Sequence, residues 1–148
     1  MPPSLFPLDE SLSFLLYRVN TQGTTAMRKA LLAAGFDLTP EQWGIMAHLQ
    51  KTAGMSQAQL GEKTLKDRNN INRIVNILEK RDHIKRQHDE DDKRAYRLFL
   101  TASGMDTLKK STPIVLKHLK KRFSGISAGD LAALRRILEQ LVKNIENR

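Results

Sequence analysis

The amino-acid sequence predicts a mainly α-helical fold with a small β-hairpin wing: a winged helix-turn-helix module flanked by N- and C-terminal helices. Two observations predict the module, namely successive segments with helical spacing of apolar residues and, after them, an alternation typical of strands. Apolar stripes in both end segments predict the flanking helices. The chain has 148 residues, the usual size of one domain. We expect one domain, with the module in residues 36–101 and a helical dimerisation region in residues 1–35 and 102–148.

The composition indicates an intracellular protein with a polyanionic partner. The net charge is +9, and because acidic and basic residues balance in residues 1–52, the excess lies in residues 53–148. Such an excess favours nucleic acid first and an anionic membrane second, although a basic protein without such a partner has the same charge. The absence of cysteine excludes disulfides, thiolate metal sites and a catalytic cysteine. The sequence shows neither a transmembrane run nor a signal peptide, so we expect a cytoplasmic location.

Capping residues set the bounds of the first two helices. A helical pattern runs over residues 9–34, and Gly35 is a natural end for it. The second helix begins at Thr39, which has the spacing of a capping box with Gln42, and it ends before Gly54.

Two further helices form the helix-turn-helix pair. The first is short, from Ser56 to about Lys63, again with a Ser-x-x-Gln capping box. The second begins at Asp67, a good N-cap, and runs to about Arg81. Its apolar residues recur at i, i+3, i+4 and i+7, which predicts a buried stripe of Ile71, Ile74, Val75 and Leu78.

Strand and helix signals follow each other in the rest of the chain. Residues 83–87 and 96–101 are predicted strands, and the polar segment 88–94 is the predicted hairpin tip. A long helix follows, kinked or divided at Pro113. A last helix starts near Ser127. Its apolar residues have the spacing of two coiled-coil heptads, which predicts a seam of Leu131, Leu134, Leu138, Leu141 and Ile145.

Opposite its apolar stripe, the second helix of the pair carries polar side chains with base-reading chemistry. In a winged helix-turn-helix this helix lies in the major groove of DNA. Asn binds adenine with two hydrogen bonds and Arg binds guanine, whereas a merely solvated face, the alternative, favours better helix formers such as Glu and Lys. The predicted major-groove residues are Arg68, Asn69, Asn72, Arg73 and Asn76.

Further DNA contacts are predicted, with phosphates at the starts of the paired helices and with the minor groove at the hairpin tip. Free amides at helix N-termini bind phosphate, and the side chains beside them are Ser56, Gln57, Gln59, Lys63 and Lys66. At the tip, Lys93, Arg94 and Arg97 suit a narrow minor groove. The acidic run Asp89–Asp92 is predicted to form a turn with an internal ion pair; the alternative, a divalent-cation site, lacks EF-hand spacing.

Four motifs occur in a recognisable order: Gln57 with Leu60, the second helix of the pair, Asp92-Lys93-Arg94, and Leu100-Thr101-Ala102-Ser103-Gly104. Together they resemble the MarR (multiple-antibiotic-resistance regulator) family of winged helix-turn-helix transcription regulators. The last two motifs match the family's Asp-x-Arg wing and its Leu-Thr-x-x-Gly. The resemblance implies that Asp92 orients the wing through ion pairs and that Arg94 reaches the minor groove.

Two departures from the family pattern affect the site. Gly61 stands where the family usually has Ala, and Thr64-Leu65-Lys66 stands where a Leu-Gly-Val-like turn is common, so the turn between the paired helices lacks its usual glycine. An Asn-rich stripe also replaces the common Ser/Thr-rich one. The docking mode is therefore transferable from the family, whereas the operator sequence is not.

Both chain ends carry apolar stripes that fit a homodimer. The first helix region offers Leu5, Phe6, Leu8, Leu12, Leu15 and Leu16, and the last helix offers its heptad seam. These stripes close the monomer core or pair two copies; because they flank a module that is complete without them, we expect pairing. Two half-sites one turn apart need this symmetry. The resemblance also implies that both chain ends intertwine.

The resemblance further implies a small aromatic or anionic ligand between the dimer region and the DNA-binding region, which shifts the spacing of the two recognition helices. Candidate lining residues are Phe14, Tyr17, Arg18, Trp43 and His48, with Arg18 as the partner of a carboxylate. A place in the core is the alternative, and the favoured one, for these side chains.

Other function classes have less support in the sequence. A phosphate loop, a nucleophile elbow and His-Glu-x-x-His are absent, and the histidines lack metal-ligand spacing, so we expect no enzyme, cofactor or metal. A membrane-surface protein has one hint, in Lys117, Lys120, Lys121 and Arg122. The sequence predicts a sequence-specific double-stranded DNA-binding regulator, a repressor that binds a palindromic operator as a homodimer and is released by a small ligand. The alternative is a winged helix that binds proteins.

Overall fold

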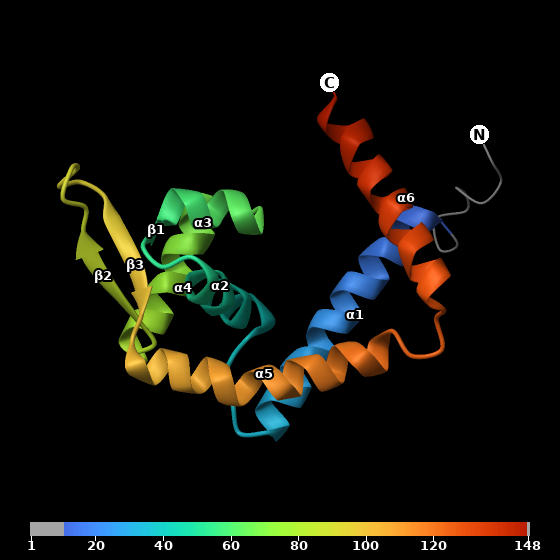
Figure 1. Ribbon diagram of the computed structural model, residues 1–148, viewed down its shortest axis with the longest axis horizontal. Helices are drawn as coiled ribbons and strands as arrows, with labels where there is room; N and C mark the ends of the chain where they lie inside the picture. Colours follow the sequence, from blue (N-terminus) through green and yellow to red (C-terminus); the bar gives the residue numbers. More distant parts are fainter. Residues whose placement is uncertain (1–10, 148) are drawn as a thin grey trace. The chain divides into compact units, whose positions relative to one another are not determined.

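The computed structural model describes residues 11–147 and has the predicted fold class, six helices with a small antiparallel sheet (Figure 1). The elements in chain order are α1 Leu12–Ala33, α2 Pro40–Lys51, β1 Met55–Ser56, α3 Gln57–Thr64, α4 Arg68–Lys80, β2 Ile84–His88, β3 Tyr96–Leu100, α5 Ala102–Arg122 and α6 Ala128–Glu146. Two compact units meet within α5, one ending at His118 and the other beginning at Leu119. In the described part of the chain, no helix combines the length and the apolar character needed to cross a membrane.

Side-chain caps start the helices of the module as predicted. In both predicted capping boxes the bonds run in both directions: Thr39 and Gln42 exchange two bonds of 3.1 Å, and Ser56 and Gln59 exchange bonds of 3.1 and 2.9 Å. Asp67 accepts the backbone N–H of Asn70 at 2.8 Å. These caps satisfy amides that have no partner within their own helix, so the helix starts are fixed by local sequence.

Helix α1 begins at Leu12, where the Ser11 hydroxyl accepts the backbone N–H of Phe14. The predicted start at residue 9 lies outside the described residues. At the other end, Gly35 has a φ of +89° and confirms the predicted stop. This left-handed conformation costs glycine little, which explains why the helix ends there.

The turn between α3 and α4 closes without the expected glycine. Leu65 takes the left-handed conformation instead, with a φ of +53°, and its side chain is 95% exposed. The Lys66 amide then donates to the Gly61 carbonyl at 3.0 Å. A Cβ at Gly61 would lie only 3.0 Å from the Lys66 carbonyl oxygen. Glycine at position 61 therefore provides the room for a turn that a bulky residue makes at position 65.

The sheet has the order β1-β3-β2, with both pairs antiparallel. The predicted hairpin is confirmed, although β2 begins and ends one residue later than predicted and β3 ends one residue earlier. Strand β1 was not predicted, because its two residues are too few to show an alternation. It pairs Met55 with Leu98 and fastens the start of α3 to the wing.

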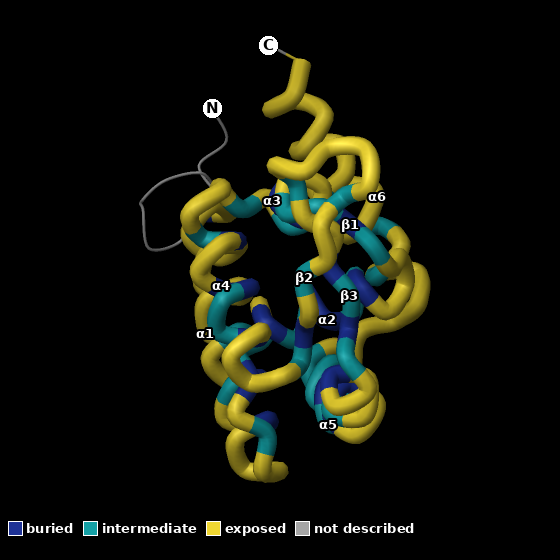
Figure 2. The backbone as a smooth tube through the Cα atoms, turned by 90° about the vertical axis from the view of Figure 1, so that its left-hand side faces the viewer, coloured by how far each residue is buried: buried dark blue, intermediate teal, exposed yellow. Residues whose placement is uncertain are grey.

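The buried core of the first unit lies between α2, α3, α4 and the sheet. All four residues of the predicted α4 stripe are buried. The side chains that are at most 1% exposed around them include Ile45, Met46, Leu49, Leu60 and Leu98, and Figure 2 shows buried positions on these elements as well as on α5. Burying such side chains contributes about 1.5–3 kcal/mol each, so this core holds α4 firmly against the wing.

Helix α5 starts against the first residues of the hairpin. The Thr101 hydroxyl donates to the Asp82 carbonyl and accepts the Gly104 amide, at 2.9 Å in the second case. A Cβ on Gly104 would lie 2.1 Å from the carbonyl oxygen of His83, a contact that no side chain can make. The Thr and Gly of the Leu-Thr-x-x-Gly motif therefore fasten α5 to the beginning of β2.

Helix α5 continues through Pro113 without the predicted division. Proline has no N–H and removes one bond of the helix ladder. In the same turn the hydroxyls of Ser111 and Thr112 donate to the Leu108 carbonyl, at 3.2 and 2.7 Å. Because Ser111 is buried and Pro113 is exposed, the interruption faces away from the packed side of the helix.

The helices at the chain ends leave their apolar residues exposed. On α1, Leu12, Leu15 and Leu16 are 54%, 44% and 44% exposed. Helix α6 contains no buried residue, and three members of its heptad seam, Leu134, Leu141 and Ile145, are at least 40% exposed. Leu5, Phe6 and Leu8 lie outside the described residues. Within the residues that the structure describes, these two stripes are therefore exposed.

Candidate nucleic-acid interface

A groove lies between the start of α3, one face of α4 and the wing, the hairpin formed by β2 and β3. Its main recess has a volume of about 910 Å³, and an adjoining one has about 400 Å³. Gln57, Asn72 and Tyr96 line both recesses, so we treat them as one surface, the α3–α4–wing groove. The other side chains used below that line it are Arg68, Asn69, Asn76, Glu79, Arg86 and Arg94.

The structure brings most of the predicted base-reading residues of α4 to this groove. Arg68, Asn69 and Asn72 are exposed there, and Asn76 is half-buried. Arg73 differs, because its Nη2 donates to Asn70 at 2.9 Å and its side chain lines a separate recess. The polar stripe therefore divides between two surfaces, and three Asn with one Arg remain in the groove.

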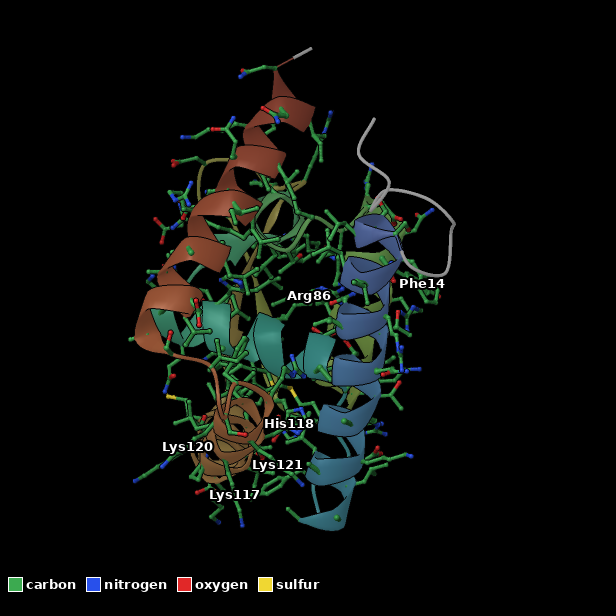
Figure 3. All side chains as sticks on the ribbon, turned by 90° about the vertical axis from the view of Figure 1, so that its right-hand side faces the viewer. Phe14, Arg86, Lys117, His118, Lys120 and Lys121 are labelled. Carbon is green, nitrogen blue, oxygen red and sulfur yellow. The ribbon has the colours of Figure 1, made fainter. Side chains whose placement is uncertain are left out.

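Arg86 of β2, labelled in Figure 3, is a groove residue that the sequence reasoning missed. Its Nη2 donates to Asn76 Oδ1 at 2.7 Å and to Asn72 Oδ1 at 3.4 Å, and its Nη1 pairs with Glu79 Oε1 at 2.9 Å. Its side chain is only 19% exposed. The available signal was the strand alternation, which separates Arg86 from the exposed Lys85 and Gln87 on either side.

Gln57, a predicted phosphate contact, also contacts α4. Its Nε2 donates to Asn72 Oδ1 at 3.3 Å, which places it beside the predicted base-reading stripe as well as at the start of α3. Among the other predicted phosphate contacts, Ser56 and Gln59 use their side-chain oxygens in the capping box. Lys66 pairs with Glu41 at 3.3 Å and is 19% exposed, whereas Lys63 is exposed.

The wing tip contains the predicted internal ion pair, formed by Asp89 and Arg97. The distance from Asp89 Oδ2 to Arg97 Nε is 3.2 Å. The backbone amide of Asp91, and then Arg97, hold the pKa of the Asp89 carboxyl below its usual range. Among the described residues, no group of three His, Asp or Glu side chains is close enough together to hold a metal ion.

Among the described residues Asp92 has a backbone contact and no ion pair, so the ion-pair role that the resemblance implies stays a prediction. Its Oδ1 accepts the backbone amide of Arg94 at 2.9 Å, which turns the chain at the tip. This leaves the Arg94 side chain exposed at the rim of the groove. Lys93 is also exposed, and its carbonyl lies 3.2 Å from His88 Nδ1. The tip thus presents two cations, and two of its four acids, Asp89 and Asp92, accept bonds within the turn, whereas Glu90 and Asp91 are exposed beside them.

A second set of charges anchors the far end of α4. Asp37, before α2, pairs with Arg28 of α1 at 2.6 Å and with Arg81 at 3.1 Å. The hydrogen bond from Arg28, followed by the charge of Arg81, holds the pKa of Asp37 below its usual range. The C-terminal end of α4 is therefore tied to the segment that joins α1 and α2.

The predicted effector residues do not form one site in the single chain. Phe14 and Tyr17 contact each other on α1, with ring centroids 6.4 Å apart, and are 39% and 64% exposed. Trp43 and His48 are half-buried on α2, and in the described chain no hydrogen bond or ring contact joins them to Phe14, Tyr17 or Arg18. A different recess of about 470 Å³ lies between α1, α2 and α4, lined by Arg28, Lys29 and Arg73 among others.

The chain is similar in sequence and in fold to known transcription regulators. The family model described as the MarR family matches residues 36–95, which cover α2 to the wing tip. The curated relative PapX of Escherichia coli, an HTH-type transcriptional regulator, is 27% identical over 93 residues, which are 63% of this chain and 57% of PapX. The chain thus matches little more than half of the length of that relative.

Solved structures match nearly the whole chain. A crystal structure described as a probable transcriptional regulator from Pseudomonas aeruginosa has a TM-score of 0.83 at 28% identity, over 91% of this chain and 99% of the other. A mutant of MarR from E. coli, complexed with operator DNA, has a TM-score of 0.80 at 18% identity, over 88% of this chain and 92% of the other. The flanking helices therefore belong to the shared fold.

Proposed function

We propose that this chain, whose residues 36–95 match the model of the MarR family, is a transcription regulator that binds double-stranded DNA in a sequence-specific way. The observation that carries the proposal is the α3–α4–wing groove. Exposed Asn and Arg side chains of α4 line it beside Arg94 of the wing. In winged helices, the corresponding helix enters the major groove, and a cation at the wing suits the minor groove.

Two further observations support this function. The net charge of +9 favours a polyanion and raises the rate of association with it. The MarR mutant complexed with operator DNA shares the fold at a TM-score of 0.80. Because DNA is the proposed partner, the cytoplasm is the proposed location.

We propose that the active form is a homodimer. The exposed apolar residues of α6 lie at heptad spacing, and a second copy of the same helix offers a matching surface. A two-fold dimer presents two copies of α4, so it reads a palindrome whose half-sites lie about one helical turn apart.

Repression with release by a ligand is the proposed form of regulation. A dimer bound across a promoter blocks access to it, and a ligand that alters the separation of the two α4 helices weakens this binding. Besides the predicted effector residues, the recess between α1, α2 and α4 offers three cations, Arg28, Lys29 and Arg73, and three Thr side chains, against one acid, Glu41. This lining favours a small anionic ligand.

The test is selection of bound duplexes from a random-sequence pool by the purified protein at near-physiological salt. We expect a palindrome with half-sites about one turn apart. If the protein retains all sequences alike and releases them as the salt concentration rises, its binding depends on charge alone. It would reject specific binding and favour a winged helix that binds proteins.

The variant Asn72→Ala refines the same experiment. Because Asn72 lines both parts of the groove, we expect relaxed preference at one base pair per half-site, by about 1–3 kcal/mol. An equal loss of affinity for every sequence would instead assign Asn72 to a phosphate.

A further inference from the structure

Tyr96 of the wing lies in the groove between the two elements that are proposed to contact DNA. It lines both recesses of the α3–α4–wing groove together with Asn72 of α4, and Arg94, two residues before it, lies at the rim. Alternate residues of a strand point to the same side of a sheet, so Tyr96 shares the side of Leu98, which is buried. This side of β3 therefore leads from the core, at Leu98, into the groove, at Tyr96.

The Tyr96 ring is positioned by its neighbour, whereas its hydroxyl has no partner. Tyr96 pairs with His88 across the β2–β3 ladder, and the centroids of the two rings are 4.5 Å apart. The Tyr96 side chain is 39% exposed. In the part of the chain that the structure describes, no hydrogen bond involves its hydroxyl. A polar group on a ring that is already positioned loses little conformational entropy when it binds.

The places of α4 and Arg94 on DNA determine which part of the duplex this hydroxyl meets. A duplex presents its bases in a major and a minor groove, and a sugar–phosphate strand separates each groove from the next. In the proposed complex, α4 lies in the major groove and Arg94 enters the adjacent minor groove. The strand between these two grooves must then cross the space between α4 and the wing, where Tyr96 lies.

The lining of the main recess suits a phosphate. It contains Arg68 and Arg94, neither of which has an ion pair among the described residues, against one acid, Glu62. A third cation, Lys66, pairs with an acid of α2. Phosphate oxygens accept hydrogen bonds, and tyrosine is one of the side chains that donate to them in protein–DNA complexes. The Tyr96 hydroxyl is a neutral donor beside these cations.

We propose that Tyr96 donates a hydrogen bond to a phosphate of the strand that crosses the α3–α4–wing groove. The inference rests on the proposed DNA-binding function and adds a contact that positions the duplex between α4 and the wing without reading a base. The register of the protein on DNA then depends on a side chain of β3, as well as on the recognition helix and the wing tip.

The experiment combines Tyr96→Phe with changes of single phosphates. Tyr96→Phe removes the hydroxyl and keeps the ring beside His88. The DNA is the selected operator, in which one phosphate at a time is replaced by an uncharged methylphosphonate. Thr52→Val is the matched control, because it removes an exposed hydroxyl at the end of α2, outside the groove lining, where the backbone is extended. Circular dichroism and the urea midpoint establish that both variants are folded.

We expect Tyr96→Phe to bind the operator about tenfold more weakly than wild type, as loss of one hydrogen bond to a charged group does. Its base preference should be unchanged, and so should the salt dependence of binding, because a neutral side chain releases no counterion. At one phosphate per half-site, methylphosphonate should weaken wild type about tenfold more than it weakens Tyr96→Phe. This phosphate should lie close to the base pair whose preference Asn72→Ala relaxes.

Four outcomes would overturn the proposal. Wild-type affinity of the folded Tyr96→Phe variant contradicts it, as do losses that simply add at every phosphate. A changed base preference would assign Tyr96 to a base, and an equal loss in Thr52→Val would show that the effect is not specific to the groove. These results leave the DNA-binding function intact, whereas failure of the wild type to select any sequence rejects both.

Discussion

The winged module and the helices at the chain ends use their apolar residues in opposite ways. In the module, Ile71, Ile74, Val75 and Leu78 of α4 are all buried within one chain. In α6 no residue is buried, although its apolar residues recur just as regularly. A regular apolar stripe therefore predicts that a helix has a packed side; the α4 stripe is packed within the described residues, whereas the α6 stripe is exposed there.

This difference separates two kinds of stability. The core of the module forms within a single chain, so its contribution to the free energy of unfolding does not depend on protein concentration. In the proposed homodimer the α6 stripe contributes only when a second copy covers it, so that contribution depends on concentration. The following experiments test the contrast, in order of decreasing expected effect.

The largest effect is expected from the double substitution Leu134→Asp with Leu141→Asp on α6. Two carboxylates on the exposed stripe should convert the dimer to a monomer, and loss of the linked second site should lower operator affinity by about 10²–10⁴-fold. Light scattering and a DNA titration measure the two effects. Lys143→Asp gives the same change in charge on the opposite side of the helix and should leave the dimer intact. A dimer that persists in the double variant would place the interface elsewhere.

The second-largest effect is expected on stability, and it compares one isoleucine of the buried core with one on α6. Ile74→Ala in the buried core should lower the free energy of unfolding by about 2–5 kcal/mol at any protein concentration. Ile137 is 49% exposed on α6, so Ile137→Ala should cost about 0.5 kcal/mol or less in dilute, monomeric protein. Urea unfolding at two protein concentrations measures both. An equally large loss for Ile137→Ala in the monomer would contradict the contrast.

A smaller effect is expected from Arg94→Ala at the wing. Removing this exposed cation should weaken operator binding about tenfold, as the loss of one charge-assisted contact does, and should reduce the salt dependence of binding. Lys109→Ala removes an exposed charge from α5 and serves as the control. Equal affinities of the Arg94 variant and wild type at moderate salt would exclude a wing that reaches DNA.

The smallest effect is a pH dependence that arises in the module. Burial, and then the charge of Arg81, hold the pKa of His83 below its usual value. Below about pH 6.5 the unfolded chain therefore binds the proton first, so stability is full above this pH and falls as the pH decreases toward the folded pKa. Urea midpoints at pH 7.5 and 5.5 should differ more for wild type than for His83→Gln. Asp37 and Asp89, whose pKa values are also lowered, titrate below this range. If the urea midpoint changes equally between the two pH values in wild type and in His83→Gln, another titratable group causes the pH dependence of stability.

Local signals explain how much of the structure the sequence could predict. The capping boxes at Thr39 and Ser56, the Asp67 cap and the α4 stripe are encoded within a few residues, and the structure has all of them. Strand β1 was missed because its two residues have meaning only beside β3. In the site, the groove position of Asn72 follows from helical spacing. The Arg86 contacts join residues 10 and 14 positions apart in sequence, and only the register of the hairpin brings them together.

The same limit applies to the wing and the effector residues. The sequence predicts an ion pair at the tip but does not distinguish Asp89 from Asp92 among adjacent acids, because the choice depends on which carboxylate faces Arg97 across the turn. Trp43 and His48 have no pattern that reveals whether they line a cavity, since half-buried side chains occur in both settings.

The close contact between Gly104 and the His83 carbonyl couples the start of α5 to the wing, so that the two move as one rigid body. A Cβ would lie 2.1 Å from that oxygen, so the helix start lies too close to β2 to slide past it. Packed protein interiors have low compressibility and transmit strain. A tilt of the start of α5 must therefore carry β2 with it, together with Arg94 at the tip. In the proposed complex with DNA, a tilt at the start of α5 would therefore displace the wing in its groove.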